Sequence, residues 1–214
     1  MSSMDGRRLE RLLTFPMTDR VFAVSLGGFW LYQSLHWGIA NRQGWPLMAL
    51  ILSALFHNLL IIFRKSPKKI SLNSVHWFVA LLACNWWLLF GGFTNQGTAL
   101  ISKNAASVIA TIGLVLSLGA KLSLWRSFGV IPAKRKLQTT GLYRFVRHPM
   151  YGIGFLMGSA FILGSFSAIN LVIAFGSIVA DIGQALVEED FFSDDGEYEA
   201  YKERVRKRFI PFVV

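Results

Sequence analysis

The stretch AINLVIAFGSIVADIGQALVEED, residues 168–190, decides how the rest of the chain is interpreted. More than half of it precedes its first charged residue, Asp181, and a helix of about 20 mainly apolar residues is long enough to cross a bilayer. Asp181 is also the first acidic residue after Asp19. Because a carboxylate within hydrocarbon costs a few kcal/mol or more, so long an absence of acids is typical of a membrane protein rather than of a soluble domain.

The composition supports the same interpretation. Of the 214 residues, 53% are hydrophobic and 16% are charged, whereas soluble domains carry roughly a quarter of charged residues. The net charge is +10, but the basic residues form short clusters between apolar runs. Such clusters are typical of membrane topology signals and anionic-lipid contacts, so we expect no nucleic-acid partner. The single cysteine, Cys84, excludes a disulfide framework and a zinc site, and we expect no metal.

Working outward from this stretch, we predict an all-α, polytopic membrane helix bundle. The chain contains six apolar segments, at residues 21–40, 45–63, 75–93, 105–125, 149–164 and 168–190. The segment 149–164 is short for a full span, so five to six transmembrane helices are expected. The turn at residues 164–167 would join the last two helices in a C-terminal hairpin.

The basic residues alternate between the segments that connect these helices. From the N-terminus to the C-terminal tail, Lys and Arg number 4, 1, 4, 1, 6, 0 and 5. Since cytoplasmic loops carry the excess of basic residues, both termini are predicted to be cytoplasmic, as an even number of spans requires. We expect a multi-pass protein of a bacterial inner membrane rather than of the endoplasmic reticulum. The oligomeric state is left open.

Residues 126–149 form a long connection that contains many apolar side chains, which predicts an ordered, functional loop. Pro149 suits the first turn of a helix, and His148 then lies near its N-cap. Tyr151 follows one turn along. The free N–H groups of this helix end favour a carboxylate or a phosphate.

The end of the last helix provides the second polar cluster. Asp181, Gln184 and Glu188 share one helical face, and Glu189 follows directly. A helix end that emerges into water would explain these acids equally well. Two interpretations therefore remain: a cytoplasmic pocket at the ends of the last two helices, which we expect, or a helix end that simply emerges into water.

Three motifs together resemble a known family. LQTTGLYRFVRHPMYGIG (137–154), EE (188–189) and EYEAYKERVRKRFIPF (197–212) resemble the C-terminal half of isoprenylcysteine carboxyl methyltransferases, which are related to the phospholipid N-methyltransferases. The resemblance spans roughly residues 110–212. It implies an enzyme that uses S-adenosylmethionine and methylates a lipophilic or membrane-embedded, lipid-like acceptor. We expect one membrane domain over 1–214, with spans of no recognised motif in 1–104 and a methyltransferase-like half in 105–214.

The resemblance also implies site residues. The cofactor-binding residues implied are Arg135, Lys136, Leu137, Gln138, Tyr143, His148, Pro149, Met150, Tyr151 and Glu188. The candidate catalytic residues are Arg147, His148 and Glu189. The candidate substrate residues are Asp181, Gln184, Tyr201 and Arg204, with Glu189, Tyr201 and Arg204 also expected to support a lid formed by the tail.

One departure from the family leaves the acceptor open. The carboxyl methyltransferases carry an arginine at the position of Gln184, and an amide cannot replace its charged, bidentate contact with a carboxylate. A carboxylate, amine or thiol acceptor and a phosphatidylethanolamine-type N-methyltransferase therefore remain alternatives. Sterol reductases also carry RHPxY, but Met150 and Ile153 differ from their RHPNY–GD pattern. A non-catalytic membrane protein of the same fold is the remaining alternative.

Overall fold

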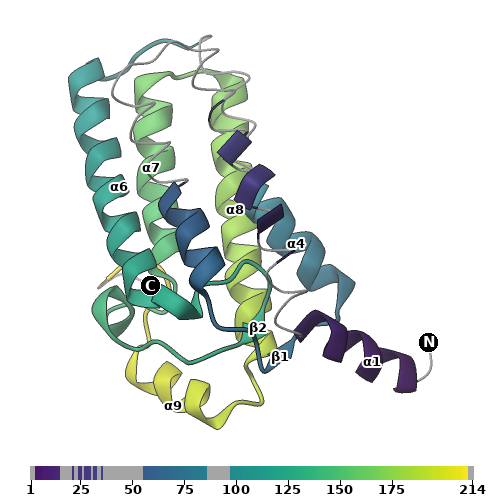
Figure 1. The fold of residues 1–214 in the computed structure, drawn as a ribbon. Helices are drawn as coiled ribbons and strands as arrows, with labels where there is room; N and C mark the ends of the chain where they lie inside the picture. The colour runs from purple at the N-terminus through teal and green to yellow at the C-terminus, as the bar shows by residue number, and fades with distance from the viewer. Residues whose placement is uncertain are drawn as a thin grey trace.

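The computed structural model describes residues 3–14, 21, 24–25, 27–29, 31–32, 35, 55–85 and 97–211. Three long helices form the C-terminal bundle: α6 (Lys103–Leu124), α7 (Pro149–Gly164) and α8 (Ala168–Phe191). Helix α7 packs against both α6 and α8, and α4 (Ser74–Asn85) packs against α8 (Figure 1). The described residues are therefore mostly helical, as predicted.

The helix ends follow local capping rules. Ser102 accepts a hydrogen bond from the Ala105 amide at the start of α6, and Ser167 accepts one from the Asn170 amide at the start of α8. Helix α7 begins at Pro149, whose missing N–H costs nothing in a first turn. The side chains of Ser102 and Ser167 thus satisfy first-turn amides that have no partner within the helix.

The predicted spans can be compared with the helices one by one. Within the described residues, the helices 103–127 and 168–191 are long and apolar enough to cross a membrane, whereas 74–84 and 149–164 are apolar but shorter. The helix predicted at 149–164 has those bounds in the structure. Most of segment 21–40, residues 45–54 and residues 86–93 lie outside the described residues. The total number of spans therefore stays a prediction.

A two-stranded sheet, which the all-α prediction missed, joins two loops at one end of the bundle. Strand β1 (Lys69–Ile70) pairs antiparallel with β2 (Ala133–Lys134), with Lys69 opposite Lys134 and Ile70 opposite Ala133. Strands of two residues are too short to give an alternating hydrophobic pattern, which is why the sequence did not reveal them. At the other end, Thr98 pairs with Phe166. The strongly basic loops thus share one end, and its cytoplasmic orientation stays a prediction.

The connection after α6 is ordered, as expected. It contains the 3₁₀ turns η1 (Trp125–Ser127) and η2 (Gly141–Arg144) on either side of β2. Its apolar side chains are buried against side chains of α4 and of the segment before α4. This cluster comprises Leu60, Ile61, Ile70, Ala80, Phe128, Val130, Ile131 and Ala133. Burial of this surface holds the loop against the bundle.

Two shorter helices complete the described structure. Helix α1 (Ser3–Thr14) lies beside β1, and α9 (Gly196–Arg204) starts after Asp195, whose side chain accepts a hydrogen bond from the Glu197 amide (Figure 1). After α9 the tail returns across the start of α7. There the amides of Arg147 and His148 donate to the carbonyls of Lys207 and Arg208, at 2.9 and 2.7 Å.

Gly152 permits this close approach of the tail to α7. A Cβ atom at this position would collide with the backbone carbonyl of Phe209. Because the obstacle is backbone rather than a flexible side chain, a larger residue would require the tail to move. Gly158, one and a half turns further along α7, has open space instead.

Candidate functional site

A cavity of about 230 Å³ lies at the end of the bundle where the basic loops gather. Its walls come from the loop 127–138, the first turn of α7, the end of α8 and α9. Val130 and Leu137 provide apolar surface, and Arg135 and Lys136 provide positive charge. The cavity therefore joins segments that are far apart in the sequence.

The structure brings most of the predicted cofactor-binding residues to this one cavity. Those that line it are Arg135, Lys136, Leu137, Gln138, Tyr143, His148, Met150, Tyr151 and Glu188. Pro149 is buried at the first position of α7 but does not line it. Of the other candidates, Arg147 and Tyr201 line the cavity, whereas Glu189, Gln184, Asp181 and Arg204 do not.

Glu188 joins α8 to the start of α7. Its Oε1 accepts a hydrogen bond from the Tyr151 hydroxyl at 2.7 Å and a second from Gln184 Nε2 at 3.1 Å. Its Oε2 lies 3.6 Å from Nδ1 of His148. One carboxylate oxygen is thus anchored twice, and the side chain remains about a quarter exposed.

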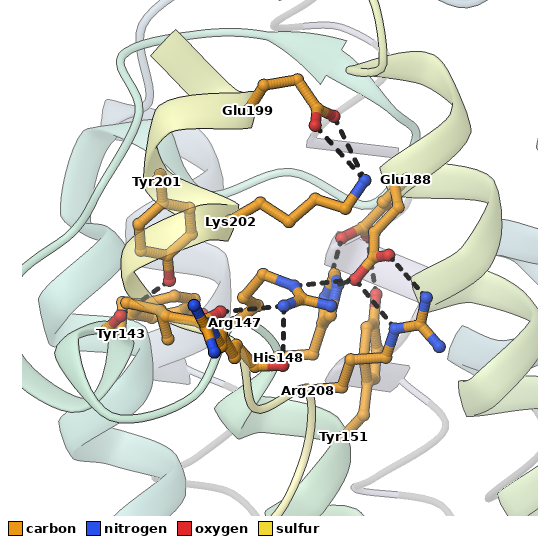
Figure 2. A network of polar contacts seen from close by, with 12 residues as sticks. Tyr143, Arg147, His148, Tyr151, Glu188, Glu199, Tyr201, Lys202 and Arg208 are labelled. Atoms are coloured by element: carbon orange, nitrogen blue, oxygen red, sulfur yellow. Dashed lines mark hydrogen bonds and ion pairs between the residues drawn. The ribbon is translucent and has the colours of Figure 1, made fainter. Parts of the chain in front are cut away.

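Glu189 contacts a separate group of side chains, two arginines and a histidine. Its Oε1 lies 3.0 Å from Nε of Arg147 and 3.2 Å from Nε2 of His148, and its Oε2 lies 3.0 Å from Nη2 of Arg208. Figure 2 shows Arg147, His148 and Arg208 converging from the loop and the tail. Such charge-assisted contacts are stronger than neutral hydrogen bonds. Glu189 therefore holds the tail and the start of α7 to α8.

Arg147 adds a second connection to the tail. Its Nη1 donates to the carbonyls of Val205 and Arg206, at 2.8 and 2.9 Å. The Arg147 side chain is almost fully buried, so these contacts also satisfy donors that water does not reach. Besides lining the cavity, Arg147 thus binds the segment that follows α9.

Helix α9 is fastened to the loop through two tyrosines. The Tyr201 hydroxyl donates to the backbone carbonyl of Tyr143 at 2.7 Å (Figure 2). Burial raises the pKa of both phenols above the usual value, so both remain neutral at physiological pH. Tyr198, also on the cavity, has a buried hydroxyl for which the described residues provide no hydrogen-bond partner.

The start of α7 faces the cavity with its free backbone end. The side chain of His148, at the N-cap, makes no capping hydrogen bond and binds Glu189 instead. Met150 and Tyr151, in the first turn, line the cavity. The partial positive charge of a helix N-terminus is therefore available at the cavity wall.

The predicted substrate residues lie in different environments. Gln184 is almost completely buried and also donates to the carbonyl of Val130 at 3.1 Å. Asp181 is half-buried on α8, close to Gly154 of α7. Arg204 is exposed at the end of α9, whereas Tyr201 is buried. Only Tyr201 of this group lines the cavity.

Sequence reasoning missed several residues of this region. Arg208 was counted only as part of a basic tail, and its contact with Glu189 required the return of the chain across α7. Ser127 and Phe128 line the cavity but lie outside the three motifs, and Tyr198 lies within the last motif but had no role assigned to it. The spacing of Tyr198 and Tyr201, three residues apart on a short helix, was the one available signal. Within the described part of the chain, no group of side chains is arranged to hold a metal ion.

Residues 104–195 match the family model described as phospholipid methyltransferase. A search of curated proteins found no match. The matched segment runs from α6 to Asp195, at the N-cap of α9, and so includes the loop, α7, α8 and most of the cavity wall. Residues 104–195, a little under half of the chain, are therefore similar to the phospholipid methyltransferases, a family of membrane methyltransferases related to the isoprenylcysteine carboxyl methyltransferases.

Proposed function

We propose that the chain is an S-adenosylmethionine-dependent methyltransferase that acts on a lipophilic acceptor within the membrane. The observation that supports this most directly is the cavity, because it gathers nine of the ten predicted cofactor-binding residues, all but Pro149. The match to a membrane methyltransferase family covers the same segments. Helices 103–127 and 168–191, which are suited to cross a bilayer, end beside the cavity.

The residues around the cavity fit the chemical groups of this cofactor. The N-terminal end of α7, at Met150 and Tyr151, favours a carboxylate. Glu188 offers an acceptor oxygen to an ammonium or hydroxyl group, and Val130 and Leu137 provide apolar walls for a purine base. A site that combines apolar walls with a few placed polar groups is typical of small-molecule binding.

When bound, S-adenosylmethionine supplies the electrophilic methyl group. No covalent protein intermediate is needed for its transfer, so the protein contributes mainly position and exclusion of water. Arg147 and Glu189 hold the tail over the start of α7, and Tyr201 holds α9 against the loop. Held in this way, the tail and α9 would cover the cavity.

The acceptor class is the less constrained part of this proposal. An amine acceptor must lose a proton, and Glu189, His148 and Asp181 are the candidates for accepting it. Glu189 already faces two guanidinium groups, which weakens it as a base and leaves His148 and Asp181. The family match favours a phospholipid amine. Against a carboxylate acceptor, the amide of Gln184 provides no positive charge and is engaged by Val130 and Glu188.

Binding of S-adenosylhomocysteine to the detergent-solubilised protein tests the cofactor assignment by calorimetry. We expect saturable binding that is abolished in the double variant His148→Ala, Glu188→Ala. Absence of binding by the wild-type chain at millimolar ligand would refute the proposed function. Binding that survives the double substitution would refute the site instead.

The acceptor is identified by methyl transfer from labelled S-adenosylmethionine into a total lipid extract. Recovery of the label in the headgroups of aminophospholipids would support N-methylation. Recovery as a base-labile methyl ester would support a carboxylate acceptor despite Gln184.

A further inference from the structure

Gln184 is a buried polar residue that the proposed chemistry does not use directly. Its side chain is 1% exposed and does not line the cavity. It nevertheless contacts two groups that belong to the cavity wall, Val130 in the loop and Glu188 on the same helix. A buried amide with these partners requires an explanation beyond packing.

The two partners fix the orientation of the Gln184 amide. Both the carbonyl of Val130 and Oε1 of Glu188 are acceptors, each 3.1 Å from Nε2. Rotation of the amide by half a turn would place an oxygen against both of them. The nitrogen therefore faces the site, and Oε1 of Gln184 is left buried with no hydrogen-bond partner among the described residues. An unpaired buried acceptor costs free energy, and the two donated hydrogen bonds offset that cost.

The two carboxylate oxygens of Glu188 therefore differ in their hydrogen bonds. Oε1 is held from one side by Gln184 and from the other by the Tyr151 hydroxyl. Oε2 lies 3.6 Å from His148 Nδ1, beyond ordinary hydrogen-bond distance. A carboxylate that is anchored through one oxygen presents the other in a fixed direction.

We propose that Gln184 is a positioning residue: it fixes Glu188 through Oε1 and holds the loop at Val130, so that Glu188 Oε2 is directed at the cofactor. This inference rests on the proposed function, because the cavity is taken as the cofactor site. A neutral side chain is suited to this role.

The first test is a double-mutant cycle on S-adenosylhomocysteine affinity, measured by calorimetry in detergent. Gln184→Met keeps the side-chain length and removes both donated hydrogen bonds. We expect about two- to tenfold weaker binding, the usual effect of losing a hydrogen bond. In the Glu188→Ala background, which removes the acceptor, the same substitution should change affinity by less than about twofold, because Gln184 acts through Glu188. Unchanged affinity for Gln184→Met, or an equal loss in both backgrounds, would overturn the proposal.

The matched control is Asn170→Leu in the same helix. Asn170 is also fully buried, donates to the carbonyl of Ser165, and lies near the opposite end of α8. The Asn170→Leu substitution should lower the melting temperature without changing the affinity for S-adenosylhomocysteine. A loss of affinity equal to that of Gln184→Met would reduce the role of Gln184 to general stability and overturn its positioning role.

Hydrogen exchange of the protein without ligand separates this inference from the proposed function. Gln184→Met should increase exchange of the amides in loop 128–131, whereas Asn170→Leu should not. If the Met variant does not fold, Gln184→Leu tests the same contact, since its side chain has no hydrogen-bond donor. Unchanged loop exchange would overturn the contact itself. Absence of S-adenosylhomocysteine binding by the wild-type chain, with the loop effect present, would overturn the proposed function and the cofactor-directed role only.

Discussion

The carboxylate of Glu189 accepts a 3.0 Å hydrogen bond from Nε of Arg147, and both side chains are more than nine-tenths buried. Arg208, from the tail, approaches the other carboxylate oxygen at 3.0 Å. With Arg208, the pair therefore connects α8, the segment just before α7 and the chain after α9. Its removal should affect stability more than any exposed ion pair nearby.

The first prediction concerns Glu189→Ala. The substitution leaves Arg147 buried without its counter-ion, and the loss of one partner from a buried pair typically costs about 3–5 kcal/mol. We expect a clear decrease in the melting temperature in detergent, measured by scanning fluorimetry. The control is Glu199→Ala, which removes only a contact with Lys202 between partly exposed side chains. Since such pairs contribute about 0–1 kcal/mol, an equal effect of the two substitutions would contradict the assignment.

A second prediction tests the contact between the tail and α7. Gly152→Ala places a Cβ atom against the carbonyl of Phe209, so the tail must shift. We expect faster tryptic cleavage at Arg206–Arg208 than in the wild type. Gly158→Ala, on the same helix but with open space around it, should leave cleavage unchanged. Equal cleavage rates in both variants would show that the tail does not depend on this contact.

Two tyrosine hydroxyls of α9 provide a matched comparison. Tyr201→Phe removes the hydrogen bond to the Tyr143 carbonyl and should cost about 0.5–1.5 kcal/mol of stability. Tyr198→Phe removes a buried hydroxyl that has no partner among the described residues, so it should be neutral or stabilising. Melting temperatures of the two variants measure the difference. The reverse order would refute the hydrogen-bond pattern.

The start of α9 should depend on pH through Asp195. Lys134 Nζ lies 2.7 Å from its carboxylate and lowers its pKa below the ordinary value of an aspartate. Because the folded pKa is lowered, this stabilisation is fully present above pH of about 4 and is lost as the pH falls through the lowered value. Amide exchange across α9, corrected for intrinsic rates, should therefore show constant protection from pH 8 to about 5. Asp195→Ala should show reduced protection over that whole range, since a helix cap contributes about 0.5–2 kcal/mol. A gradual loss between pH 8 and 5 in the wild type would contradict this assignment.

The predicted membrane orientation can be measured with cysteine labelling. The single native cysteine is removed by Cys84→Ser. A new cysteine is then introduced either as Ser193→Cys, just after the end of α8, or as Ala99→Cys, beside the Thr98–Phe166 pair near the start of α8. An impermeant maleimide added to intact cells should label position 99 and spare position 193. Labelling of position 193 alone would reverse the predicted orientation.

The sequence predicted those features that depend on local patterns. Pro149 and the Gly164–Ser165 turn determined the bounds of α7, and the apolar run after Ala168 determined α8. The gathering of His148, Tyr151 and Glu188 was expected from motif resemblance. In contrast, the partners of Glu189 are separated from it by 42 residues in one case and by 19 in the other, and no sequence pattern specifies such contacts.

The role of Gln184 illustrates the same limit. In the sequence, the amide at this position indicated only that the charged contact of the related enzymes was missing. A sequence pattern does not show which groups a side chain contacts. The structure places its nitrogen between Val130 and Glu188. The short β1–β2 sheet was missed because its pairing depends on how two distant loops meet.

That sheet also affects how the chain can be divided. Strand β2 belongs to the segment that matches the methyltransferase family, but its partner β1 lies well before that segment begins. The apolar cluster beneath the cavity likewise combines Val130 and Phe128 with Leu60 and Ala80. A fragment that starts at residue 104 would expose this surface and leave the cavity wall without its support. Exchange of the matched segment between relatives would therefore require residues 55–85 to be exchanged with it.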